Sequence, residues 1–274
     1  MSNQTAFSTS KFQVGLIGVG VMGEALISGL VSARFPKAQI VFSEKRSDRA
    51  REISTKYGAR AVELQSLVKE SDVILIVVKP QDLGELLASI APDLKKRALL
   101  VSFAAGKTTS FISQKVGPEI SVIRVMPNTA TLIGLGMAAM SIGANVSDEQ
   151  AKFVADFLAT CGKVISIDES LQDAVTALSG SGPAYFFAFV EEMIKSGISL
   201  GLSSDEASTL AIQTIIGSAA MLEQSGKNPT TLRENVTSPN GTTAAALKVF
   251  NDAEFGEIIK KAMTAARDRS QELA

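Results

Sequence analysis

Six residues near the start of the chain have the spacing of a phosphate-binding turn. They are Gly18, Val19, Gly20, Val21, Met22 and Gly23. A β-branched run precedes them and helix formers follow, so the turn would join a strand to a helix. Glycine permits a close approach of the backbone, and the start of a helix directs unpaired N–H groups at a pyrophosphate. The pattern favours dinucleotide binding over a turn used only for packing.

A polar cluster follows roughly 20 residues later, where such folds contact the adenosine ribose. It consists of Ser43, Glu44, Lys45 and Arg46. Glu44 fits a ribose 2′-hydroxyl, as in NAD-dependent enzymes, whereas Ser43, Lys45 and Arg46 fit the 2′-phosphate of NADP. A third interpretation is a solvated charge cluster that begins a helix. The residue types leave all three open.

Two further segments follow strand-like runs. Val78, Lys79 and Pro80 follow one run, and Ala104 and Ala105 follow another. In an open parallel sheet the carboxyl ends of the strands line the ligand crevice. Lys79 is therefore a candidate for cofactor contact, although a surface lysine without a role has the same spacing.

The second half of the chain contains two polar, glycine-rich segments in an apolar setting, Ser179–Pro183 and Thr237–Thr243. The second precedes a predicted helix at Ala244–Phe250. Its hydroxyl and N–H groups could hold a small carboxylate or could simply cap that helix. Arg124, just before a Met-Pro-Asn segment, is either a substrate clamp or a brace for a strand end.

Composition restricts the chemistry. The chain has 274 residues, a formal net charge of −1, no histidine and one cysteine, Cys161. Without histidine it lacks the commonest general base and metal ligand, so we expect no metal and no Ser–His or Cys–His nucleophile. A single cysteine forms no intrachain disulfide, and we expect a buried thiol in a cytoplasmic protein. The charge balance and the short apolar runs predict neither a nucleic-acid partner nor a membrane segment.

Alternating strand-like and helix-like runs must position these residues. Predicted strands are Phe12–Ile17, Gln39–Ser43, Val73–Val78, Ala98–Phe103, Ser121–Val125, Met137–Ser141 and Lys163–Ile167. Predicted helices are Met22–Leu30, Asp48–Tyr57, Asp82–Ile90 and one that begins at a capping box, Ser147–Gln150. The alternation predicts an α/β fold with a Rossmann-type doubly wound sheet over residues 1–168. Met1–Lys11 is polar and rich in Ser and Thr, and it is predicted to be a loose tail.

Only helix-like runs follow, and they predict an all-α domain over residues 169–274. Pro183 suits the start of an aromatic-rich helix, and Ser203–Glu206 is a second capping box. The last predicted helix has its apolar residues on one face, namely Phe255, Ile258, Ile259, Ala262 and Ala266. The aromatic run Tyr185–Phe189 fits a core or a subunit interface. Apolar and small residues suit helices shared with a second copy, so we expect a homodimer, with a higher oligomer of dimers as an open alternative.

In combination these motifs resemble the pyrroline-5-carboxylate reductase family. The motifs are Gly18-x-Gly20-x-Met22-Gly23, Val78-Lys79-Pro80-Gln81, Arg124-Val125-Met126-Pro127-Asn128, Leu178-Ser179-Gly180-Ser181-Gly182-Pro183-Ala184-Tyr185 and Val236-Thr237-Ser238-Pro239-Asn240-Gly241-Thr242-Thr243. They occur in that family's order. Asn240 stands where the family usually has glycine.

The resemblance implies the last step of proline biosynthesis, in which NAD(P)H reduces 1-pyrroline-5-carboxylate to L-proline. We expect NADPH to be preferred, with NADH as the alternative. Ser238 and the backbone of Gly241, Thr242 and Thr243 would bind the substrate carboxylate, and the Thr243 hydroxyl would be the catalytic group at the ring nitrogen. The resemblance assigns the cofactor to the segments described above, together with Asn235 near the nicotinamide ribose.

Two other interpretations compete. An imine reductase or a β-hydroxyacid dehydrogenase would need a catalytic lysine or tyrosine in the helical part, and we expect the candidate, Lys195, to lie on a solvated stretch. A non-catalytic nucleotide sensor would not need the polar cradle beside the glycine turn.

Overall fold

The computed structural model describes residues 11–273, so most of the predicted N-terminal tail lies outside the described residues. Within this range one sheet contains eight strands in the order β3-β2-β1-β4-β5-β6-β7-β8. The strands are β1 Val14–Ile17, β2 Ile40–Ser43, β3 Arg60–Ala61, β4 Val73–Ile76, β5 Leu99–Ser102, β6 Ser121–Met126, β7 Gly136–Ile142 and β8 Gly162–Ser166. All seven predicted strands are present, and the edge strand β3 was missed.

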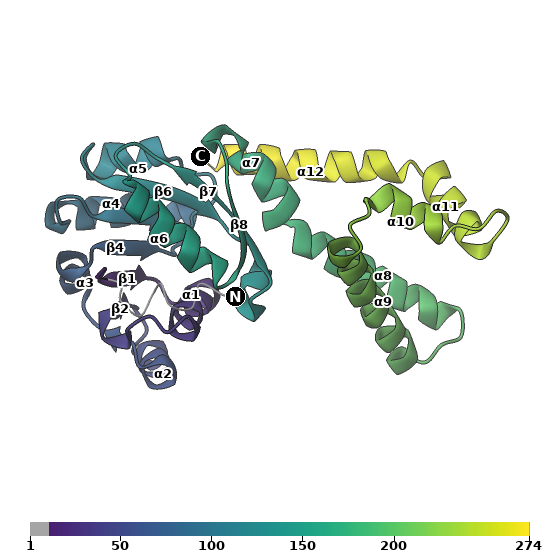
Figure 1. The fold of residues 1–274 in the computed structure, drawn as a ribbon, viewed down its shortest axis with the longest axis horizontal. Coiled ribbons are helices and arrows are strands. Elements are labelled where there is room, and N and C mark those ends of the chain that lie inside the picture. Colours follow the sequence, from purple (N-terminus) through teal and green to yellow (C-terminus); the bar gives the residue numbers. More distant parts are fainter. Residues whose placement is uncertain (1–10, 274) are drawn as a thin grey trace. The chain divides into compact units, whose positions relative to one another are not determined.

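Helices cover both faces of the sheet (Figure 1). They are α1 Val21–Ser32, α2 Ser47–Tyr57, α3 Leu64–Glu70, α4 Pro80–Ile90, α5 Thr109–Val116 and α6 Asp148–Ala159. Alternate strand residues point to opposite faces, so Val73 and Leu75 join a core with α1, α2 and α6, while Ile74 and Ile76 join one with α3, α4 and α5. The doubly wound α/β prediction is confirmed.

One strand pair departs from the parallel pattern. β7 runs antiparallel to β6, whereas the other neighbouring pairs are parallel. The connection between them holds only a short 3₁₀ turn, Thr129–Ile133, and a parallel crossover needs a dozen or more residues. The chain therefore turns back beside β6, and α6 then provides a crossover to β8.

No strand follows β8 within the described residues. The remaining elements are the 3₁₀ turn η4 Glu169–Leu171, α7 Gln172–Val175, the π-helical turn η5 Thr176–Gly180, α8 Gly182–Ser199, α9 Ser204–Gln224, α10 Pro229–Asn235, α11 Thr242–Asp252 and α12 Phe255–Glu272. Both predicted capping boxes are present, at α6 and α9. No helix among residues 11–273 has the length and apolar character to cross a bilayer.

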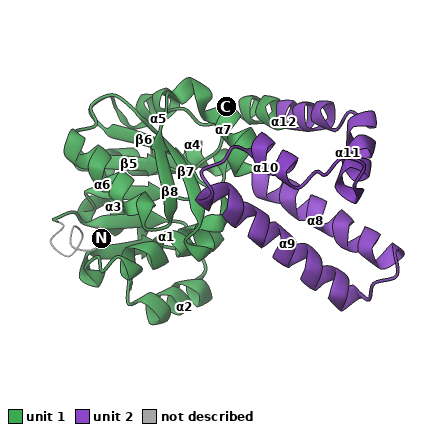
Figure 2. Ribbon diagram, turned by 45° about the vertical axis from the view of Figure 1, so that its right-hand side comes forward, with its two compact units in different colours: residues 1–181, 266–274 green, residues 182–265 purple. Residues whose placement is uncertain are grey.

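The chain divides into two compact units (Figure 2). Unit 1 runs to Ser181 and resumes at Ala266, and unit 2 is Gly182–Ala265. Unit 1 includes α7 because the Gln172 amide donates to the β7 residues Ala139 (carbonyl O, 3.2 Å) and Ser141 (Oγ, 2.9 Å). A domain boundary at residue 168 stays a prediction.

Helices α1 and α2 are joined through one carboxylate. Glu24 accepts hydrogen bonds from Lys56 Nζ and Tyr57 Oη, each at 2.8 Å, and it forms an ion pair with Arg49. These contacts, the Lys56 bond foremost, lower the pKa of Glu24 from 4.5 to about 2. Because the folded-state pKa is depressed, this stabilisation is present above pH 4.5 and is lost as the pH falls toward 2.

We expect Glu24→Gln to lower the free energy of unfolding by about 2 kcal/mol at pH 7 and by progressively less as the pH falls, because the protonated carboxyl resembles the amide. Urea unfolding of both proteins between pH 7 and pH 3 measures this. Glu85→Gln, an exposed change on α4, is the control and should show no such trend. A Glu24→Gln effect independent of pH would contradict the assignment.

Candidate cofactor and substrate sites

The glycine turn between β1 and α1 is closely packed. Gly18 has φ +88°, and a Cβ on it would lie 2.6 Å from the carbonyl oxygen of Val77. A Cβ on Gly23 would lie 2.2 Å from the carbonyl oxygen of Gly18. Gly20 precedes α1 with no side-chain cap, so the first N–H groups of this 12-residue helix have no capping partner. The turn can therefore accept the pyrophosphate of a dinucleotide.

The end of β2 is attached to this turn. The Val19 N–H donates to Glu44 Oε2 at 3.2 Å, and the Val19 carbonyl accepts from Arg49 Nε at 3.1 Å. The Gly18 N–H donates to the Ser43 carbonyl at 3.1 Å. The Glu44 carboxylate therefore faces the glycine turn, where an adenosine ribose is expected, and has further lone pairs for a diol.

Cationic groups stand at the same place. Lys45 and Arg46 are exposed, and the Arg46 guanidinium lies 3.8 Å from Glu44 Oε1. The Arg46 N–H also donates to that oxygen at 3.1 Å. A carboxylate for a ribose diol and two cations for a phosphate thus occur together, so the geometry accommodates both nucleotide types.

The strand order brings the predicted cofactor segments of unit 1 to one sheet edge. β2, β1, β4 and β5 are consecutive neighbours, and each ends beside one of these segments. Lys79 is exposed and precedes α4, whose first residue is Pro80. Ala104 is buried, and its N–H donates to Ser102 Oγ at 3.3 Å. This edge lies where the strand order reverses, between β1 and β4, the usual ligand crevice of such sheets.

The predicted substrate residues lie in unit 2, together with Asn235 at the end of α10. Asn240 adopts the left-handed conformation, φ +58°, which asparagine tolerates better than most residues. The Gly241 N–H donates to the Ser238 carbonyl at 3.0 Å and closes the turn. Gly241 precedes α11 without a side-chain cap, so the helix starts with the open N–H groups of Thr242 and Thr243.

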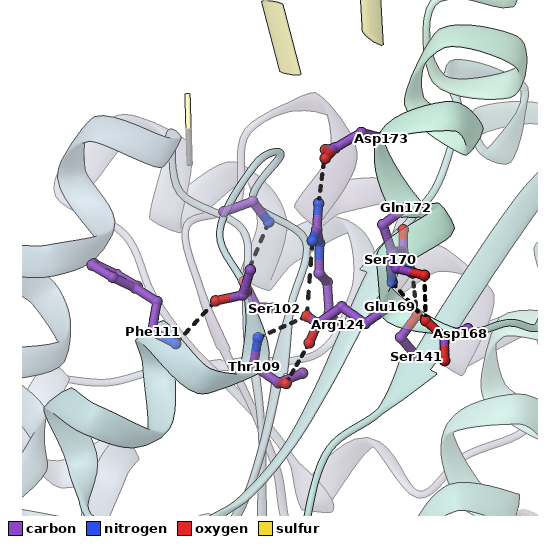
Figure 3. A network of polar contacts seen from close by, with 12 residues as sticks. Ser102, Thr109, Phe111, Arg124, Ser141, Asp168, Glu169, Ser170, Gln172 and Asp173 are labelled. Atoms are coloured by element: carbon purple, nitrogen blue, oxygen red, sulfur yellow. Dashed lines mark hydrogen bonds and ion pairs between the residues drawn. The ribbon is translucent and has the colours of Figure 1, made fainter. Parts of the chain in front are cut away.

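Of the two roles predicted for Arg124, the structure favours a brace for a strand end over an exposed substrate clamp, because the side chain is buried and ion-paired. It is 3% exposed, with Nη1 3.8 Å from Glu169 Oε1 and Nη2 3.5 Å from Asp173 Oδ1. Figure 3 shows these side chains converging on β6 from η4 and α7. Glu169 and Asp173 were not predicted as partners of Arg124, because no spacing in the sequence relates them to it.

The surroundings of Cys161 and Lys195 do not suit a catalytic role. Cys161 is buried, and burial raises the pKa of its thiol. Lys195 is paired with Glu191 and Glu192, each at 2.7 Å, and these hydrogen bonds raise its pKa above the ordinary value. An exposed Lys195 held in two ion pairs lies on a solvated stretch, as expected, and does not support the rival dehydrogenase interpretation.

The glycine turn and the doubly wound sheet define a dinucleotide-binding oxidoreductase fold with a helical addition. A family model described as "Pyrroline-5-carboxylate reductase dimerisation" matches residues 169–273, and one described as "NADP oxidoreductase coenzyme F420-dependent" matches residues 13–106.

Similar proteins extend the match to almost the whole chain. Pyrroline-5-carboxylate reductase 1 of Bacillus subtilis is 38% identical over 96% of this chain and 89% of its own length. The Pseudomonas aeruginosa enzyme is 39% identical over 96% of this chain and 97% of its own length. A Plasmodium falciparum pyrroline carboxylate reductase, solved with NADP bound, is 31% identical with a TM-score of 0.87 and covers 96% of this chain and 98% of its own. The chain belongs to the pyrroline-5-carboxylate reductase family.

We expect Lys45→Ala/Arg46→Ala to weaken NADPH binding about tenfold or more and to change NADH binding little, because charged hydrogen bonds to the 2′-phosphate are lost. Glu44→Gln should shift the ratio of the two affinities in the opposite direction. A fluorescence titration with each reduced nucleotide measures the two dissociation constants. Arg51→Ala, an exposed change on α2, is the control. Equal losses for both nucleotides would show that Lys45 and Arg46 do not bind the phosphate.

Proposed function

We propose that this chain reduces 1-pyrroline-5-carboxylate to L-proline with NAD(P)H, the last step of proline biosynthesis. The observation that carries the proposal is the match of 96% of the chain to relatives named pyrroline-5-carboxylate reductase. The glycine turn fits the cofactor because Gly20 precedes α1 with no side-chain cap, which leaves the first N–H groups of the helix open to a pyrophosphate. NAD(P)H supplies the hydride when bound.

The turn before α11 is proposed to hold the substrate. The Ser238 hydroxyl and the N–H groups of Thr242 and Thr243 bind the carboxylate, at the positive end of the helix dipole. Gly241 uses its own N–H within the turn, so its contribution is the close approach that a missing Cβ permits. The Thr243 hydroxyl hydrogen-bonds the ring nitrogen and orients the C=N bond.

The proposed cofactor residues divide by the part of the nucleotide that they contact. Gly18 to Gly23 hold the pyrophosphate, and Ser43, Lys45 and Arg46 hold the adenosine ribose end. The loops at Val78–Pro80 and Ala104–Ala105 line the remainder, and Asn235 contacts the nicotinamide ribose.

The missing histidine is compatible with this reaction. A carbonyl reductase needs an acid to protonate the nascent alkoxide, whereas a protonated cyclic imine becomes a neutral amine on accepting hydride. Binding residues that fix the ring and the nucleotide in a reactive arrangement are then sufficient, and such positioning contributes up to about 7–11 kcal/mol to lowering a barrier.

Unit 2 supports a homodimer because it lacks a core of its own. Within Gly182–Ala265 only small residues, Gly182, Ala207 and Ala211, are buried. Large apolar side chains stay exposed, such as Phe187 at 69% and Leu200 at 86%. A surface this apolar marks an interaction face, and the matching family model is one of dimerisation. The single cysteine supports a reducing, cytoplasmic location.

We expect Thr243→Val to lower kcat/KM by about 10- to 100-fold, because the isosteric change removes the hydrogen bond to the ring nitrogen. The nucleotide dissociation constant should not change. Thr242→Val is the matched control, since it preserves the backbone N–H and removes a hydroxyl with no assigned role. Oxidation of NADPH by the cyclic imine, followed by absorbance, measures the rates. Wild-type kinetics in Thr243→Val would remove the hydroxyl from the mechanism.

We expect sedimentation of the full chain at micromolar concentration to give a dimer. Phe187→Glu should shift the equilibrium toward monomer, because a carboxylate would be buried in the interface. Thr55→Glu places the same charge on the exposed face of α2 and should leave the dimer intact. A stable wild-type monomer would overturn the assembly proposal.

A further inference from the structure

A buried cation interrupts the apolar sheet. Arg124 on β6 is in register with Ser102 on β5 and Ser141 on β7, and all three residues are buried. They form a polar row near the carboxyl end of β5, beside the loop that carries Ala104 and Ala105. Two carboxylates, of Glu169 and Asp173, approach the guanidinium.

Each carboxylate also holds a second element. Glu169 accepts the Thr109 N–H at 2.7 Å and the Thr109 hydroxyl at 2.6 Å, which fixes the start of α5. Asp173 accepts the hydroxyl of Ser270, a buried residue of α12, at 2.7 Å. Figure 3 shows Arg124 between Glu169, which contacts Thr109 of α5, and Asp173 of α7. The Ser270 bond extends this connection from Asp173 to α12.

The loop between β5 and α5 also packs directly on α12. Gly106 in this loop has φ +74°, and a Cβ on it would lie 2.9 Å from the carbonyl oxygen of Ser270. The segment after Ala104 and Ala105 is therefore held on one side by Glu169 and on the other by the last turns of α12. The chain enters unit 2 after α7 and η5 and leaves it through α12.

Stability alone does not account for this cluster. Desolvation offsets the attraction within a buried ion pair, and well-packed apolar residues in its place are often as stable or more so. Ion pairs to two acids, at 3.8 and 3.5 Å, instead specify where the buried guanidinium lies between η4 and α7. The elements so specified are the proposed cofactor loop and the two segments that join the units.

We propose that Arg124 is a positioning residue for hydride transfer. Through Glu169 and Asp173 it fixes the Ala104–Ala105 loop against α7 and the end of α12. The inference rests on the proposed function, because it assigns that loop to the cofactor. A displacement of about 1 Å at a reacting centre can cost roughly 100-fold in rate, so loosening this cluster should lower kcat without abolishing nucleotide binding.

The test compares Arg124→Met and Arg124→Lys in the full-length enzyme. We expect Arg124→Met to lower kcat by about 10- to 100-fold, to change the nucleotide dissociation constant by less than about threefold, and to raise the deuterium isotope effect with 4-deuterated nicotinamide. Arg124→Lys should restore part of kcat, since lysine keeps the charge but not the fork of donors. Arg60→Met, which breaks the exposed ion pair with Glu70, is the control and should leave kcat unchanged.

The outcomes separate the two proposals. A wild-type enzyme that does not reduce the cyclic imine defeats the proposed function. An active wild type whose Arg124→Met variant keeps its kcat and isotope effect, with only a lowered Tm, overturns the positioning role. If Arg124→Met does not fold, Thr109→Val and Ser270→Ala each remove one hydrogen bond of the cluster and should lower kcat by about threefold or more. Unchanged kcat and isotope effect in both would equally overturn it.

Discussion

The close approach of two backbone segments in the glycine turn is the constraint on which the proposed cofactor site depends. The start of α1 reaches the end of β1 only because Gly23 presents no Cβ to the carbonyl oxygen of Gly18, which it would meet at 2.2 Å. That contact places the helix N-terminus at the carboxyl edge of the sheet. Parallel pairing of β1 with β2 and β4 then brings the other loops to the same edge. A bulkier residue would displace the helix and the anion site together.

Carboxylates in unit 1 occur in two different settings. Glu44 accepts the N–H of Val19 in the glycine turn and the N–H of Arg46, and it is only half-buried. Glu169 and Asp173 instead surround a buried guanidinium and connect segments of the fold. The first arrangement leaves a carboxylate beside the proposed nucleotide site, and the second holds segments of the fold together.

In unit 2, local helix capping is present but burial of large apolar side chains is not. Two of its helices have side-chain caps, a reciprocal capping box at Ser203 before α9 and Asn228 before α10. Local capping does not bury apolar surface, however, and the unit exposes most of its large apolar side chains. Helices stabilised chiefly by tertiary packing need a covering surface, which is the physical basis of the homodimer proposed above.

The sequence by itself determined the strands, most helices and the glycine turn, because periodicity, capping residues and glycine spacing act between near neighbours. It did not reveal β3, α3, α5, α7 or α10; β3 is only two residues long, α7 only four, and no residue of α10 is buried. Only the tertiary structure decided the antiparallel direction of β7, the contact of Glu44 with Val19 and the pairing of Arg124 with Asp173. The two side-chain contacts join residues far apart in the chain, which meet only after the sheet has assembled, so no local pattern encodes them. The direction of β7 follows from the short connection after β6, which periodicity alone does not reveal.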